Sequence, residues 1–168
     1  MQSKQIDIEW LSDIHECDDC GMSDADGAVI KIDGKEVLEL LPSAYCYDSD
    51  SWDKSEVMGL LLGQMGVRVM LQNEDCEPRD LSRGRPCDEF ADLPPDTRTV
   101  LLETFVLRDD DTDDYSQGFR ITREGEVLIE KLPSLMGPDK SPYYTTKEML
   151  VEVAEFFGAR FSPDSISG

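Results

Sequence analysis

Two stretches of this chain repeat the same order of sequence features, at an offset of about 90 residues. Residues 36–43 read Glu-Val-Leu-Glu-Leu-Leu-Pro-Ser, and residues 126–134 read Glu-Val-Leu-Ile-Glu-Lys-Leu-Pro-Ser. Each stretch is followed by a loop, an apolar-periodic segment and a Gly-x-Arg, which falls at residues 66–68 and 158–160. An internal period of this kind indicates two copies of one supersecondary unit and therefore predicts a pseudo-symmetric body.

The predicted fold class is α+β, with two similar β-β-β-α units in which helices pack on antiparallel sheet. The first unit spans residues 1–72 and the second spans residues 98–168. A Pro-rich loop at 73–97 joins them, because its prolines come without any apolar periodicity. The last residues, 162–168, are predicted to form a tail.

Turn and cap signals fall at matching places in the two units. Asp33-Gly34 and Glu124-Gly125 each separate two apolar-alternating runs, which predicts two hairpins with tight turns. Asp53 and Thr145 are each followed three residues later by a glutamate, a pattern that caps a helix N-terminus. A glycine at position 66 and another at position 158 are predicted to end these helices.

Each unit also begins with a strand and an acid-rich connection. The first unit is predicted to open with a strand at 6–11 and an acidic loop at 13–26, and the second with a strand at 98–107 and an acidic loop at 109–114.

The net charge of −21 is weighted toward the first half, because residues 1–60 hold fifteen acids against four bases. Such a field repels nucleic acids and anionic membranes and attracts basic protein surfaces. Direct binding of nucleic acid is therefore not expected. The chain contains no apolar stretch of the ~20 residues that a membrane span needs, and its start lacks a secretion signal. A soluble, cytoplasmic protein is expected.

Catalysis and cofactors find no support in the sequence. There is one histidine, and no nucleophile elbow, phosphate loop or dinucleotide fingerprint is present. We therefore expect a protein that is not an enzyme and that carries no cofactor.

The segment His15-Glu16-Cys17-Asp18-Asp19-Cys20 is a weak metal candidate through His15, Cys17 and Cys20. A zinc site normally needs a second ligand pair, and Cys76, Cys87 and Cys46 do not form one in the sequence. The flanking acids are also expected to raise the thiol pKa values by like-charge repulsion. Five cysteines without a secretion signal favour reduced, incidental thiols. No metal is therefore predicted, and a small zinc-binding adaptor stays an alternative.

The charge pattern favours an inhibitor that binds a basic, nucleic-acid-handling protein or complex. Rows of carboxylates can imitate a phosphate backbone, as anti-restriction and anti-CRISPR proteins of viruses do as a class. Two alternatives are a toxin-neutralising immunity protein and an acidic protein adapted to high salt. The predicted partner-binding residues are Asp18, Asp19, Asp24, Asp26, Asp48, Asp50, Asp109, Asp110, Asp111, Asp113 and Asp114.

Overall fold

The computed structural model describes residues 3–72, 78–83, 93–94, 96–109, 111, 115–133 and 144–166. In this part of the chain the fold is mixed α+β, mostly sheet with a few short helices. Contacts divide the chain into two compact units, Met1–Val57 with Ala154–Gly168, and Met58–Val153. The predicted segments 1–72, 73–97 and 98–168 are stretches of the sequence, whereas the two units are defined by contacts. The predicted segments therefore stay a prediction.

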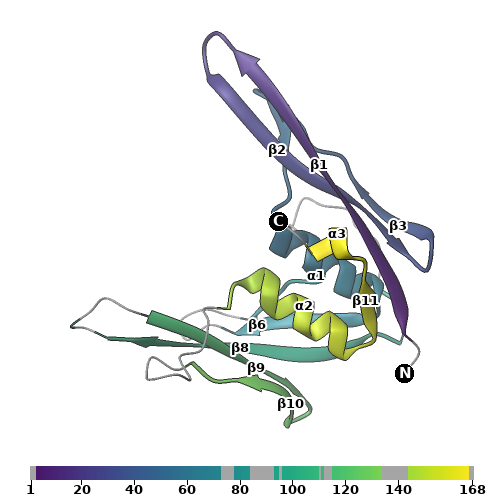
Figure 1. Cartoon of the computed structure of the whole chain (residues 1–168), viewed down its shortest axis with the longest axis vertical. Coiled ribbons are helices and arrows are strands. Elements are labelled where there is room, and N and C mark those ends of the chain that lie inside the picture. Colours follow the sequence, from purple (N-terminus) through teal and green to yellow (C-terminus); the bar gives the residue numbers. More distant parts are fainter. Residues whose placement is uncertain are drawn as a thin grey trace. The chain divides into compact units, whose positions relative to one another are not determined.

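The first unit is built on a four-stranded sheet with the order β11-β1-β2-β3 (Figure 1). Its strands are β1 (Lys4–Cys17), β2 (Gly21–Ile32), β3 (Lys35–Leu40) and β11 (Ala159–Phe161). The first three strands are antiparallel, whereas β11 runs parallel to β1. Ile6, Ile8, Ile30 and Leu40 are buried in this sheet. A buried set on one face fixes the register, because a slip of one residue would expose all of it.

The second unit contains a five-stranded sheet with the order β10-β9-β8-β6-β7. Its strands are β6 (Val67–Gln72), β7 (Arg79–Asp80), β8 (Arg98–Arg108), β9 (Tyr115–Arg123) and β10 (Glu126–Lys131). Here β6 runs parallel to β8, while the other neighbours are antiparallel. Val69, Val100, Leu102, Phe119 and Ile121 are buried. The predicted strand at 98–107 is confirmed by β8, and a short strand, β7, lies within the predicted connecting loop.

Matching features occur in the hairpins β2–β3 and β9–β10. Both central residues of each turn have positive φ, with 52° and 81° at Asp33-Gly34 and 52° and 84° at Glu124-Gly125. This confirms the two predicted tight turns. Each hairpin also has one irregularity in its register. Val37 of β3 therefore has no residue opposite it in β2, and Leu128 of β10 has none opposite it in β9.

Two strand glycines make the same kind of close approach. A Cβ on Gly27 would collide with the backbone carbonyl of Leu40 and with Pro42, and a Cβ on Gly118 would collide with the carbonyl of Lys131 and the backbone at Pro133. Only glycine fits where another backbone comes this close.

The described helices are α1 (Lys54–Gln64), α2 (Thr146–Phe156) and α3 (Pro163–Ile166). The Asp53 carboxylate accepts the N–H of Glu56 at 2.8 Å, and the Glu56 carboxylate accepts the N–H of Asp53 at 2.9 Å. Thr145 Oγ1 accepts the N–H of Glu148 at 3.2 Å. Both predicted caps are thus confirmed. Within the described residues, none of the helices has the length and apolar character needed to span a membrane.

Each of the longer helices ends at a glycine and leads into the parallel strand of its sheet. Gly66 and Gly158 have φ of 79° and 100°, values that let the chain leave the helix. The carbonyl of Gly158 accepts the N–H of Lys4, and that of Gly66 accepts the N–H of Arg98, both at 2.8 Å. The strand that follows each helix therefore pairs with the first strand of the other half of the sequence.

The predicted acidic loop at 13–26 is wrong for most of its length. β1 continues to Cys17 and β2 begins at Gly21, so Asp18, Asp19 and Cys20 alone form the turn. Apart from the exposed Ile14 and Met22, the residues that extend these two strands are small or polar, and Ala25 is buried. An apolar-run criterion does not detect such a strand.

The predicted tail is also wrong, because Pro163–Ile166 within it form the helix α3. Ser165 in this helix is fully buried, and its hydroxyl accepts the N–H of Ile8 at 2.8 Å. Its carbonyl accepts the indole N–H of Trp10 at 3.0 Å. These bonds fix the C-terminal segment on β1, with which α3 is in contact.

Candidate functional site at the end of the first hairpin

The free end of the β1–β2 hairpin, residues 12–26, is here called the first arm. Directly opposite residues of an antiparallel pair share one face of the sheet. The register places the pairs Asp13↔Ala25, His15↔Ser23 and Cys17↔Gly21 on one face and Ser12↔Asp26, Ile14↔Asp24 and Glu16↔Met22 on the other. The first arm therefore has two chemically different faces.

One face is covered by a small hairpin made of β4 (Ser43–Tyr45) and β5 (Asp48–Asp50). The N–H of Ala44 donates to the Asp13 carboxylate at 2.9 Å, and the Ser23 hydroxyl donates to the Ala44 carbonyl at 2.7 Å. The rings of His15 and Tyr45 pack with their centroids 4.7 Å apart. These contacts hold the small hairpin on the arm. The sequence reading treats this segment as part of a loop.

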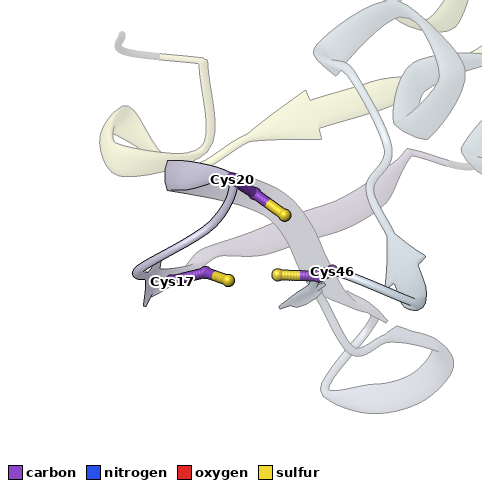
Figure 2. Close-up of side chains that lie close together, drawn as sticks. All are labelled: Cys17, Cys20 and Cys46. Atoms are coloured by element: carbon purple, nitrogen blue, oxygen red, sulfur yellow. The ribbon is translucent and has the colours of Figure 1, made fainter.

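Three cysteines meet where the small hairpin covers the end of the arm. Cys17 is the last residue of β1, Cys20 is the last residue of the turn between β1 and β2, and Cys46 lies in the turn between β4 and β5. Figure 2 shows their sulfur atoms directed toward a common point. The three Sγ atoms all lie within 4.8 Å of one another. The structure thus joins Cys46 to the predicted pair Cys17 and Cys20, whereas His15 is outside the cluster and packs on Tyr45.

Hydrogen bonding makes the thiols unequal. The backbone N–H groups of Asp19 and Cys20 donate to the Cys17 sulfur, and together with the Cys46 and Cys20 thiols they lower the pKa of Cys17 to about 7. The hydrogen bond to Cys17 is the main cause that raises the pKa of Cys46 to about 11, with burial second. The expectation that neighbouring acids raise the thiol pKa is wrong for Cys17, because N–H groups aimed at its sulfur dominate.

The other face of the first arm is open and combines apolar with acidic side chains. Ile14 and Met22 are 67% and 73% exposed and lie diagonally across the two strands. Glu16, Asp24 and Asp26 are exposed around them. Large apolar side chains exposed together within a charged rim are typical of an interaction surface.

The structure places the predicted partner-binding residues in two groups. In the first unit, Asp18, Asp19, Asp24, Asp26 and Asp50 are exposed, and Asp48 lies in β5 with its side chain outside the described part. In the second unit, Asp109 and Asp111 lie between β8 and β9. Of its predicted residues, Asp110, Asp113 and Asp114 lie outside the described residues.

The end of the β8–β9 hairpin, residues 105–117, is here called the second arm. Val106 and Leu107 are about half exposed, but Arg108 is exposed beside them and pairs with Tyr115. The carboxylate of Asp109 accepts the N–H of Asp111 at 2.9 Å, which closes a local turn. The second arm therefore mixes both signs of charge.

A further charged cluster in the second unit is structural in character. The Asp80 carboxylate pairs with the Arg68 guanidinium at 2.7 Å and with Arg83 at 3.3 Å, and it accepts hydrogen bonds from Ser82. Burial of this carboxyl tends to raise its pKa, but the bonds from Ser82 and then Arg68 outweigh burial, and the pKa is lowered. The cluster ties β7 to β6.

Comparisons with models of protein families, with curated proteins and with solved structures found no match to this chain.

Proposed function

We propose that this protein is a non-enzymatic inhibitor that binds a basic, nucleic-acid-handling protein or complex, and that the open face of the first arm is its contact surface. The observation that carries the proposal is the exposure of Ile14 and Met22 within a rim of acids. Apolar side chains at the centre supply binding free energy, while charged groups at the rim steer association and select the partner.

The charge of the arm defines the partner. Residues 5–30 contain eight acids and no lysine or arginine. A surface of this sign favours a basic partner and discriminates against acidic ones, because like-charge contacts cost free energy at an interface. Proteins that handle nucleic acid present basic clefts for the phosphate backbone. A toxin of this type fits the same surface, so an immunity protein is one form of the proposal.

Salt adaptation accounts for the net charge but not for the arm. A protein adapted to high salt gains from a dispersed acidic surface, and exposed Ile14 and Met22 serve no purpose there. An unfolding curve measured against KCl separates the two ideas. We expect a cooperative fold without molar salt, and a strict requirement for molar salt would favour adaptation.

The test compares two variants that carry the same change in net charge. The first-arm variant is D18K/D19K/D24K, and its matched control E36K/E39K/E126K reverses three exposed acids elsewhere. Each full-length protein is used to capture partners from a lysate of the native host, and the partner that the wild type retains is purified for titration calorimetry. We expect the first-arm variant to bind about 100-fold more weakly and the control to stay within about threefold.

Two outcomes would reject the proposal. Equal losses in both variants would mean that total charge, and not the arm, controls binding. An affinity for the captured partner that does not change with salt would remove the electrostatic basis of the proposal.

The fold itself supports a second element of the proposal, namely that the chain is a duplicated β-β-β-α unit whose helices pack on its sheets. The tight turns, the close-approach glycines and the helix-ending glycines recur in the same order. In both halves of the sequence, the strand that follows the helix runs parallel to the first strand of the other half: β6 pairs with β8, and β11 pairs with β1. Buried side chains on α2, such as Met149, Leu150 and Val153, fit a helix that covers a sheet.

A further inference from the structure

We propose that Cys17, Cys20 and Cys46 bind one Zn²⁺ ion through three thiolates. The site goes beyond the proposed binding function and can be tested without any partner. Thiolates are the ligands that zinc prefers in structural sites, and a hard cation such as Mg²⁺ selects oxygen instead.

The positions of the sulfur atoms suit one small ion. The three Sγ atoms lie within 4.8 Å of one another and point inward (Figure 2). A Zn–S bond of about 2.3 Å in a tetrahedral site places sulfurs about 3.8 Å apart. The cluster therefore needs adjustments of no more than about 1 Å, which side-chain torsions of exposed or half-buried cysteines supply.

The backbone of the turn is arranged for negative charge on sulfur. The N–H groups of Asp19 and Cys20 both donate to the sulfur of Cys17. Gly21 follows at once with φ of 83°, a conformation that lets the chain turn back into β2 after Cys20. The sulfur atoms of Cys17 and Cys20, three residues apart on this turn, thus lie close together on the side of Cys46 (Figure 2).

The surrounding charge favours a cation at this position. Asp18 and Asp19 lie between the two cysteines, and residues 5–30 contain no lysine or arginine. A dication would relieve the repulsion between these acids and the thiolates. Among the residues that the structure describes, three ligands come together, because His15 packs on Tyr45. A water molecule would complete the tetrahedral set.

The ion would join two parts of the first unit that are far apart in the sequence. Cys17 and Cys20 belong to the arm, whereas Cys46 belongs to the small hairpin that covers it. Metal bound by both segments adds its binding free energy to the stability of this contact. The zinc site would thereby hold the β4–β5 hairpin against the first arm.

The test uses the full chain, reduced and freed of metal, with Zn²⁺ titrated against a chromophoric chelator. We expect one equivalent of zinc to bind. Cys46→Ser is expected to weaken binding at least about 100-fold, since it removes one of three thiolates. The matched control C76S/C87S changes the other two cysteines of the chain and is expected to stay within about threefold, as is His15→Ala.

A second measurement guards against a variant that simply fails to fold. Co²⁺ bound to the wild type is expected to show thiolate-to-cobalt charge transfer with the intensity of three sulfurs, and this signal should fall in Cys46→Ser while the circular dichroism is unchanged. Failure of the reduced wild type to bind zinc would overturn the site. Loss of binding in C76S/C87S or in His15→Ala would overturn the ligand set. A disulfide between two of the three cysteines in protein purified under reducing conditions would assign the cluster to redox chemistry instead.

The two proposals fail independently. The effect of D18K/D19K/D24K on partner affinity is measured in the presence of chelator, so it does not depend on whether zinc binds. If no partner binds, the zinc titration is unaffected.

Discussion

The first and second arms occupy the same place in the order of strands, yet they differ in chemistry. Each is the free end of the first hairpin in its half of the sequence. The first arm is acidic, carries two cysteines and is covered on one face by the β4–β5 hairpin. The second arm has no cysteine and places Arg108 beside its exposed apolar residues.

This difference separates the parts of the molecule that specify the fold from those that we assign to function. The matched features are turns, close-approach glycines and helix ends, all of which are backbone requirements. The arms, where the side chains face solvent or one another, differ most between the two halves of the sequence. Function is therefore best sought where the two halves differ, and stability where they agree.

The largest expected effect concerns the paired glycines, Gly27 and Gly118. Gly27→Val and Gly118→Val should each lower the free energy of unfolding by about 1–3 kcal/mol, because the new side chain meets a backbone carbonyl in both cases. Urea denaturation measures the loss. Lys31→Val, at an exposed position of β2, is the control and should stay within about 0.5 kcal/mol. A valine tolerated at one glycine but not at the other would break the correspondence.

The next effect concerns the two arginines of the repeated Gly-x-Arg. Arg68 pairs with Asp80, whereas Arg160 donates at 3.4 Å to the carbonyl of Ala159 and has no ion pair within the described residues. Arg68→Ala should therefore cost about 1 kcal/mol more than Arg160→Ala at neutral pH.

The pH dependence of that difference has a definite sign. The folded pKa of Asp80 is lowered from 3.8, so its stabilising effect is fully present above pH 3.8 and is lost as the pH falls through the folded pKa. Urea curves for both variants at several pH values measure this. In Asp80→Asn the cost of Arg68→Ala should largely disappear. A difference that survives both acidification and Asp80→Asn would show that the pair does not stabilise the second unit.

The smallest expected difference between the two halves concerns the helix caps. Asp53 makes a reciprocal pair of bonds with Glu56, while Thr145 has a single longer bond to Glu148. Asp53→Ala should cost about 1–2 kcal/mol, and Thr145→Ala should cost about 0.5–1 kcal/mol. Thermal or urea unfolding ranks the two, and the reverse order would show that cap geometry does not set their contribution.

The sequence predicted the features that depend on neighbouring residues. Asp33-Gly34, Glu124-Gly125, the caps at Asp53 and Thr145, and the helix end at Gly66 all follow from local backbone chemistry. Such signals carry their own physical cause within a few residues.

The features that sequence reasoning missed depend on distant residues. The extension of β1 to Cys17 needs a partner strand and is marked by small and polar residues rather than an apolar run. Burial of Ser165 depends on β1, and the approach of Cys46 to Cys17 depends on the covering hairpin. A single sequence does not reveal these pairings, because nothing in the spacing of the cysteines encodes them.

The most direct test of the account is the affinity of the captured partner for three proteins at low and at high salt: the wild type, D18K/D19K/D24K, and a second-arm variant, D109K/D111K. We expect the first-arm variant to lose about 100-fold in affinity at low salt and the second-arm variant to lose less than about tenfold, with both differences smaller at high salt. Equal losses in the two variants, or a larger loss from the second arm, would contradict the assignment of binding to the first arm.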